Sequence, residues 1–349
     1  MALITASFTS EAPLHPKAAE LLSLVFDRGW ADPAKIHDAS REVGRLLQEA
    51  KTTFATAFGV RPDEIYFLGE PPLGFHLGIN GFLTSESTLL YSGTDRAPVH
   101  AIVDDRINRG MAVKKDGASI ATESDLLVFQ AVNPETGLRS PVPENFPGLI
   151  FVDNTAYGVH AALPDNWVSA IWQSRSWQGP SGLGVLAIRN GSQWRNPLPH
   201  NDVNKVPQSF SIPLALASAV ALENFTREYE ESRERITHMK KVLINFLHTD
   251  ITGVLVAGDV EKSSPYLLSV SVAGIDSERL VNELRERSID VDSGSACISA
   301  NMQPSHVLAA MGLPTTGNLR FTFHPQITEE QIDYLLNNLK ELVIRQRNN

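Results

Sequence analysis

The residue with the clearest nucleophilic chemistry is Cys297, the single cysteine among 349 residues. A lone cysteine cannot form a disulfide within the chain, and it excludes a zinc or iron–sulfur site built from several cysteines. Ser293, Gly294, Ser295 and Ser299 surround it and predict a polar, flexible loop. A thiol on such a loop could act as a nucleophile or accept a sulfur atom. The competing interpretation is a small buried apolar side chain, but the polar neighbours favour exposure.

The composition is that of an acidic globular protein. Hydrophobic residues make up 42% of the chain and charged residues 20%, and the formal net charge is -10. An acidic chain is a poor candidate for binding nucleic acid or an anionic membrane. Residues 1–16 lack the basic and apolar regions of a signal peptide, and no apolar run approaches the roughly 18 residues of a membrane span. We therefore expect a cytoplasmic protein with neither nucleic acid nor membrane as partner.

The first two-thirds of the chain alternate between helical and extended patterns. Residues 36–58 carry apolar side chains at helical spacing, a short strand follows at 64–68, a loop at 69–72 and a second helix at 73–82. Short apolar runs bounded by turn residues predict strands that are buried on both faces. These runs are residues 87–91, 126–132, 149–152, 168–172 and 184–188. The pattern predicts an α/β fold with a mainly parallel central sheet wrapped by helices.

The last third predicts a second, smaller domain. Residues 214–241 read as one long helix that begins apolar and ends highly charged. The elements expected after it are a strand at 267–272, a helix at 277–287, a strand at 289–291, a small-residue loop at 293–296 and a final helix at 329–344. We predict a large α/β domain over residues 15–225 and a small α+β domain over residues 226–349, completed by residues 1–14.

Several motifs near the C-terminus closely resemble one enzyme family. Residues 292–297 read DSGSAC, residues 304–308 PSHVL and residues 319–322 LRFT, and TEEQID follows at 328–333. They resemble the C-terminal signature of the cysteine desulfurases, a branch of the class V aminotransferase-like enzymes that use pyridoxal phosphate (PLP). That signature combines an SGSAC loop, a PSHVL helix start, an arginine before a strand and a final TEEEID-type helix.

Earlier segments fit the same family in the same order, although less closely. AVNPETG at 131–137 resembles its V-N-N-E-x-G segment, and VDNTA at 152–156 resembles V-D-A-T-Q. SRSWQGPSGLG at 174–184 resembles S-x-H-K-x-x-G-P-K-G-x-G. The resemblance implies the PLP-transferase fold type I and a homodimer whose site is built across the two-fold axis.

The resemblance also implies roles for four residues. Asp153 stands where the family's aspartate pairs with the pyridine nitrogen of PLP, and Asn133 matches an asparagine near the ring. Arg320 stands where an arginine binds the substrate carboxylate, and Cys297 where a thiolate attacks the substrate sulfur. Each has a plainer interpretation as well: Asp153 could cap a turn, Asn133 could form one, and Arg320 could make a surface ion pair.

At the family's lysine the sequence departs from the pattern. Ser176 occupies the position of the lysine that forms the Schiff base with PLP, and a serine hydroxyl cannot form an imine. No lysine occurs between Lys115 and Lys205, so a small shift of the alignment does not restore one. Arg175 replaces the preceding histidine, and Arg96 replaces the histidine that stacks on the ring.

The phosphate-binding loop has changed as well. Residues 69–74 read GEPPLG in place of a Ser-Gly-Ala-Thr-Glu type sequence. Pro71 and Pro72 have no N–H to donate to a phosphate, and Glu70 would repel one. Ser211, in the loop expected to face the partner subunit, could still reach a phosphate. Arg96 and Arg175 leave an anion-binding pocket to which Arg320 could also contribute.

Three functions are compatible with this pattern. The first is a cysteine desulfurase-like protein that is degenerate for PLP catalysis, in which Cys297 carries a persulfide or the chain acts as partner of a true desulfurase or of a sulfur-acceptor protein. The second is a functional PLP-dependent cysteine desulfurase, or a related lyase or transferase. The third is a purely structural paralogue. PLP, if it binds, is expected to be held without a covalent link.

Overall fold

The computed structural model describes residues 5–11, 13–28, 31–116, 121–199, 206, 210–294 and 304–348. The chain divides into two compact units. The large unit comprises Pro13–Val132 and Ser140–Glu228, and the small unit comprises Met1–Ala12, Asn133–Arg139 and Tyr229–Asn349. The divisions at 12/13 and 228/229 lie close to the predicted 14/15 and 225/226. Residues 133–139 lie within the predicted large domain but group with the small unit, to which they are bonded, for example through the bridge between Leu138 and Ser263.

A seven-stranded sheet forms the centre of the large unit, with the strand order β2-β8-β7-β6-β5-β3-β4. The neighbours from β4 through β3, β5 and β6 to β7 are parallel, and β8 runs antiparallel to both β7 and β2. Every residue of β8 is buried, and β5, β6 and β7 each have one part-exposed residue. The predicted mainly parallel sheet is confirmed. The strands are β2 Ile65–Leu68, β3 Leu89–Tyr91, β4 Val113–Lys115, β5 Leu126–Gln130, β6 Leu149–Asp153, β7 Trp167–Gln173 and β8 Gly184–Ile188.

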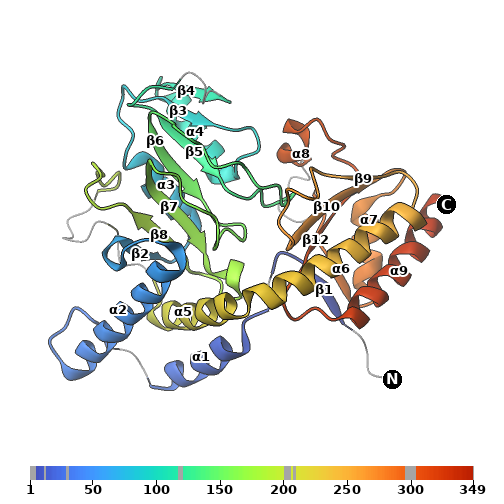
Figure 1. Cartoon of the computed structure of the whole chain (residues 1–349), viewed down its shortest axis with the longest axis horizontal. Helices are drawn as coiled ribbons and strands as arrows, with labels where there is room; N and C mark the ends of the chain where they lie inside the picture. Colours follow the sequence, from blue (N-terminus) through green and yellow to red (C-terminus); the bar gives the residue numbers. More distant parts are fainter. Residues whose placement is uncertain are drawn as a thin grey trace. The chain divides into compact units, whose positions relative to one another are not determined.

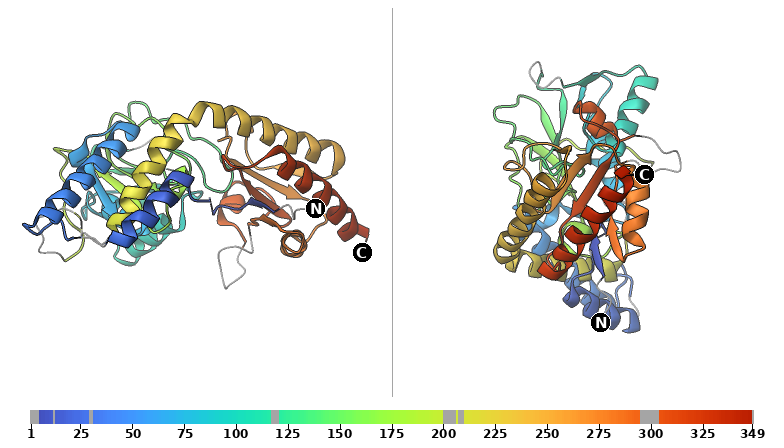
Figure 2. Two further views of the ribbon diagram at one scale, coloured as in Figure 1. Left: turned by 90° about the horizontal axis from the view of Figure 1, so that it is seen from below. Right: turned by 90° about the vertical axis from the view of Figure 1, so that its right-hand side faces the viewer.

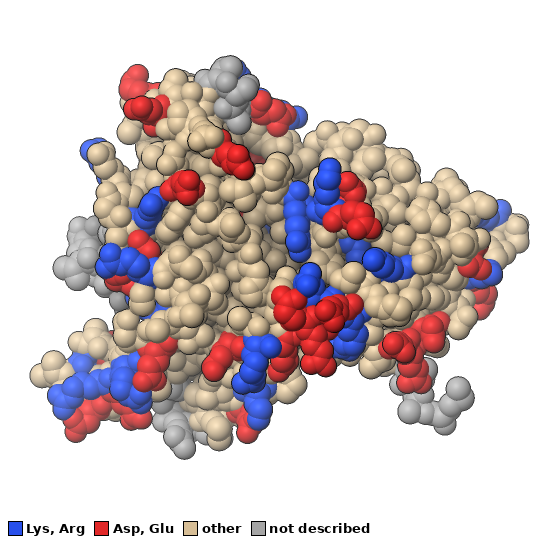
Figure 3. All heavy atoms as spheres, viewed as in Figure 1, with Lys and Arg blue, Asp and Glu red and all other residues tan. Residues whose placement is uncertain are grey.

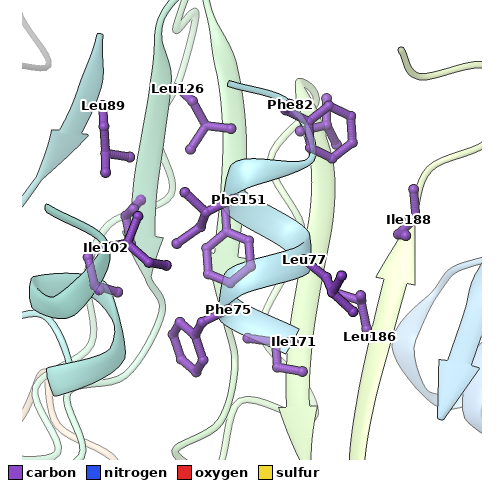
Figure 4. Packing of buried hydrophobic residues seen from close by; sticks show 14 of the residues in the cluster. Phe75, Leu77, Phe82, Leu89, Ile102, Leu126, Phe151, Ile171, Leu186 and Ile188 are labelled. Carbon is purple, nitrogen blue, oxygen red and sulfur yellow. The ribbon is translucent and has the colours of Figure 1, made fainter. Parts of the chain in front are cut away.

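Helices cover both faces of this sheet (Figure 1). Helix α3 (Pro71–Asn80) packs on one face, where a Cβ atom at Gly74 would lie 2.3 Å from Ile171 Cδ1. Figure 4 shows α3 in front of the strands, with Phe75 and Leu77 of α3 near Ile171 of β7, and α4 (Ala97–Asn108) to the side. Helix α2 (Asp38–Phe58) packs on the other face, where Phe58 stacks on Trp172 with ring centroids 4.1 Å apart. Successive β7 residues, Ile171 and Trp172, therefore face opposite layers, as the pleat of a strand requires.

The helix predicted over residues 214–241 is in fact two helices. Helix α5 (Ile212–Arg227) packs against α2 and α1 (Pro16–Arg28), and α6 (Tyr229–Asp250) follows it. Glu228 separates them with φ -92° and ψ 3°. Neither proline nor glycine marks this position, so the sequence pattern contains no break signal. The division between the two units falls directly after Glu228.

The small unit contains two sheets. An antiparallel sheet has the order β12-β10-β9, and a parallel pair joins β1 to β11. Helix α9 lies beside α6 and α7 (Figure 2). The remaining elements are β1 Ala6–Phe8, β9 Val254–Val256, β10 Leu267–Val272, α7 Ser277–Arg285, β11 Ile289–Val291, α8 His306–Ala310, β12 Asn318–Thr322 and α9 Glu329–Asn348.

Charged side chains of both signs are mixed on the surface. Figure 3 shows acidic and basic groups interspersed over α2, where Arg41 pairs with Asp38 and Arg45 with Glu49. Such exposed pairs within one helix contribute little to stability. Among the helices of the described ranges, none is both long and apolar enough to cross a membrane.

Candidate functional site

Asp153 is the last residue of β6 and is only 1% exposed. Its Oδ1 atom accepts hydrogen bonds from the Thr155 N–H at 2.9 Å and the Thr155 hydroxyl at 2.5 Å. Its Oδ2 atom accepts no hydrogen bond within the described part of the chain, and it lies 3.6 Å from Arg96 Nε. One carboxylate oxygen thus caps the turn after the strand, and the other faces an arginine.

Arg96 stands directly before α4, at the N-cap position, and its side chain is 25% exposed. Its neighbour Asp95 is 1% exposed and accepts a hydrogen bond from the Ser92 N–H at 2.7 Å. The pKa of the Asp95 carboxyl is raised from its ordinary value to about 7, chiefly by burial and in smaller part by the negative charge of Asp153, while the hydrogen bond from Ser92 acts in the opposite direction. Asp95, Arg96 and Asp153 form what we call the carboxylate–arginine cluster.

Ser176 lies in the short 3-10 turn η3 (Ser174–Trp177) that follows β7, and it is 2% exposed. Its hydroxyl donates a hydrogen bond to the Thr155 carbonyl at 2.7 Å and accepts one from the Tyr157 N–H at 3.4 Å. Thr155 therefore links Ser176 to Asp153, so the structure brings these two predicted site residues together. The buried hydroxyl serves the local backbone in the position that the family resemblance assigns to the lysine.

Arg175 precedes Ser176 and is partly exposed. Its positive charge acts on Tyr157, whose pKa burial raises and Arg175 lowers, with burial the larger effect. Among the described residues, Arg175 makes neither an ion pair nor a side-chain hydrogen bond. The anion-binding role predicted for Arg96 and Arg175 stays a prediction.

The expected phosphate end of the site lies at the start of α3. The prediction of a loop over residues 69–72 is wrong at its second half, because Pro71 and Pro72 form the first helical turn behind Glu70. Proline is well accommodated there, since first-turn N–H groups have no partner within the helix. Two of the donors that could hold a phosphate are consequently missing. Ser211 occupies the N-cap position of α5 and makes no capping bond with its side chain.

The residues present do not fit a covalently held PLP. Asp153 Oδ2 is a suitable buried acceptor for a pyridine N–H, which is the one feature that fits. Two features do not fit PLP. Ser176 cannot form an imine, and Pro71 and Pro72 have no N–H groups to donate to its phosphate. Arg96 pairs with the same carboxylate oxygen that the ring would need.

The small unit contains the other predicted site residues. Arg320 lies on β12 with 13% of its side chain exposed. Its Nη2 atom donates to the Ser293 carbonyl at 3.2 Å, and its Nη1 atom lies 3.9 Å from Glu135 Oε2. The hydroxyl of Ser305 donates to the same Glu135 oxygen at 2.6 Å. The arginine expected to bind a substrate carboxylate thus has a carboxylate of the chain itself beside it.

Asn133 is a turn-forming residue in this unit. Its Oδ1 atom accepts hydrogen bonds from the N–H groups of Glu135 and Thr136, both at 3.0 Å, and from the Thr136 hydroxyl at 3.2 Å. These bonds agree with the plainer interpretation of Asn133 as a turn-forming residue. The turn places Glu135 beside Arg320. The role of Asn133 near a cofactor ring stays a prediction, and Cys297 lies outside the described residues.

Sequence reasoning missed four residues that shape these sites. Thr155 and Ser305 had recognisable signals, since both stand where a hydroxyl commonly caps a turn or a helix. Glu135 belongs to the quoted AVNPETG segment, but its contact with Arg320 is long-range and has no local signal. Asp95 lies just before helix α4, which the sequence did not predict, and no pattern in the neighbouring residues indicates that its carboxyl is buried.

Comparisons with known proteins agree on the family. The family model described as Aminotransferase class-V matches residues 103–335. The curated relatives include the cysteine desulfurase IscS of Dictyoglomus turgidum, 24% identical over 97% of this chain and 94% of the relative. They also include the cysteine desulfurase NifS of Azotobacter vinelandii, 24% identical over 93% of this chain and 88% of the relative.

Solved structures show the same fold. A NifS-like protein superposes with a TM-score of 0.85 at 21% identity, covering 98% of this chain and 100% of that one. The apo cysteine desulfurase of Thermococcus onnurineus superposes with a TM-score of 0.78 at 18% identity, covering 98% and 95%. The predicted PLP-transferase fold type I is confirmed. Since the family model spans well over half of the sequence and the relatives align along nearly all of it, the chain belongs to the aminotransferase class-V family, in its cysteine desulfurase branch.

Proposed function

We propose that this chain is a cysteine desulfurase-like protein that forms no imine with PLP, and that Cys297 accepts sulfur from a catalytically competent desulfurase. One observation carries the proposal: Ser176, at the position expected to hold the lysine, is buried and its hydroxyl is bonded to the Thr155 carbonyl at 2.7 Å. A hydroxyl cannot take over imine chemistry, and no neighbouring lysine is available in this part of the sequence.

The acceptor role needs only a thiol. A persulfide on the donor enzyme would be attacked at its outer sulfur by the Cys297 thiolate. The bond between the two donor sulfurs breaks, a new sulfur–sulfur bond forms at Cys297, and the donor leaves as a thiolate. The exchange moves one sulfur atom without net oxidation or reduction and without a cofactor.

The test has two arms. Purified protein mixed with PLP and treated with borohydride is expected to gain no covalent adduct, and with cysteine alone it is expected to release no sulfide. Mixed with a competent desulfurase and cysteine, it is expected to gain one sulfur atom at Cys297 by mass spectrometry, and the Cys297→Ser variant is expected to gain none. A reducible PLP adduct would establish the alternative of a working PLP enzyme. An unmodified Cys297 would contradict sulfur transfer and leave a purely structural paralogue as the remaining interpretation.

A homodimer in the cytoplasm is part of the same proposal. The family resemblance supports the dimer, because residues 208–213 stand where the partner-facing loop is expected. Light scattering at micromolar concentration is the direct measurement, and a monomer there would contradict the dimer.

A further inference from the structure

We propose that Arg96 is the permanent counterion of Asp153 and that this pairing excludes a protonated pyridine ring from the large unit. The inference deepens the proposed function and rests on it, since it names the residue that determines cofactor specificity at the same site. It concerns the ring-binding end, whereas the proposed function rests on Ser176.

The argument begins with the environment of Asp153. The residue is 1% exposed, and both hydrogen bonds from Thr155 go to Oδ1. A buried carboxylate oxygen without a hydrogen-bond donor costs several kcal/mol unless a positive charge lies near it. Arg96 supplies that charge, with its Nε atom 3.6 Å from Oδ2.

The backbone holds Arg96 in place for this role. Its carbonyl accepts the N–H groups of Val99 at 2.9 Å and His100 at 3.3 Å, which fixes the residue at the start of α4. The negative charge of Asp153 favours a cation at the position of Arg96.

The choice of arginine has a chemical consequence. A guanidinium stays charged at every pH at which the protein folds, so it never vacates the carboxylate by losing a proton. A second cation, such as a protonated heteroaromatic ring, would have to displace the guanidinium from the carboxylate oxygen of Asp153. An uncharged side chain at residue 96 would leave Oδ2 open to an added ring cation.

The experiment uses pyridoxine as the probe, because it carries the pyridine ring but neither the phosphate nor the aldehyde. Its binding is therefore independent of Ser176, Pro71 and Pro72. The thermal midpoint of the full chain is measured with increasing pyridoxine for the wild type, Arg96→Ala, Asp153→Asn and the double variant. Arg175→Ala is the matched control, since that arginine does not pair with Asp153.

We expect pyridoxine to raise the midpoint of Arg96→Ala and to leave the wild type, the control and the double variant unchanged. Without pyridoxine, the double variant is expected to lose less stability than the two single changes together, because Asp153→Asn removes the charge that Arg96→Ala leaves unpaired. Additive losses, no response of Arg96→Ala to pyridoxine, or an equal response of the wild type would each overturn the proposal. If Arg96→Ala does not fold, the thermal midpoint of Arg96→Met is measured with pyridoxine in its place. A borohydride-reducible PLP adduct on the wild type would instead refute the proposed function, so the two proposals fail on different measurements.

Discussion

The carboxyl of Asp95 makes the stability of the large unit depend on pH, and Asp95→Asn is expected to remove that dependence. Burial raises its pKa from 3.8 to about 7, and the charges of Asp153 and Asp116 contribute in the same direction. A raised folded-state pKa means that the folded chain binds the proton more tightly than the unfolded chain. The stability that this proton provides is complete below pH 3.8 and is lost as the pH rises through about 7.

The size of the effect follows from the same two values. The interval from 3.8 to about 7 corresponds to roughly 4 kcal/mol of unfolding free energy, at about 1.4 kcal/mol for each pKa unit. The side chain is 1% exposed, so solvent screening reduces this figure little. An asparagine resembles the protonated acid and can still accept the Ser92 N–H. The variant is therefore expected to be more stable than the wild type at pH 8, with the difference falling below about 1 kcal/mol near pH 4.

Urea unfolding followed by tryptophan fluorescence, at a series of pH values from 4 to 8.5, measures this difference directly. Asp125→Asn is the matched control, because the pKa of Asp125 is lowered and the expected change in stability has the opposite sign. Burial alone would raise the pKa of Asp125, but hydrogen bonds from Thr122 and Thr88 outweigh it and lower the pKa. That variant is expected to be less stable than the wild type at neutral pH. A stability difference for Asp95→Asn that does not change with pH would refute the reasoning, as would a loss of stability at pH 8.

Two further substitutions test buried or part-buried hydroxyls, one in each unit. Ser176→Ala removes the donor to the Thr155 carbonyl and is expected to cost about 1 kcal/mol in urea unfolding; an unchanged midpoint would contradict the structural role of this hydroxyl. Ser305→Ala removes both the cap that accepts the Leu308 N–H and the donor to Glu135, and is expected to cost about 1–2 kcal/mol. Ser305→Thr keeps the hydroxyl and should recover most of that loss.

Much of the large unit could be predicted because its strands are buried on both faces. The run of residues 184–188 is apolar throughout and coincides with β8, which is buried along its whole length. Strand β4 was missed for the opposite reason. It lies at the edge of the sheet, and its sequence Val-Lys-Lys is mostly exposed, so no apolar pattern marks it. Its pairing with β3 comes from backbone hydrogen bonds, which no side-chain pattern reveals.

The candidate site was predictable in its residues but not in their contacts. The family motifs identified Asp153 and Ser176 as site residues. They did not predict that Thr155 connects the two, with its hydroxyl bonded to Asp153 and its carbonyl bonded to Ser176. The pair of Glu135 and Arg320 joins segments far apart in the chain. Such a contact depends on how the chain folds back, and periodicity within either segment carries no information about it.

The changed residues at the ring and phosphate positions are mutually consistent in physical terms. A family site without PLP would leave a buried carboxylate without its cation, and first-turn N–H groups without an acceptor. Here Arg96 supplies a cation to Asp153, and Pro71 and Pro72 begin α3 with residues that have no N–H to satisfy. Ser176 fills the lysine position with a hydroxyl that bonds to the neighbouring backbone. Each lost cofactor contact is thus matched by a group of the chain itself, which is what a stable fold without an internal imine requires.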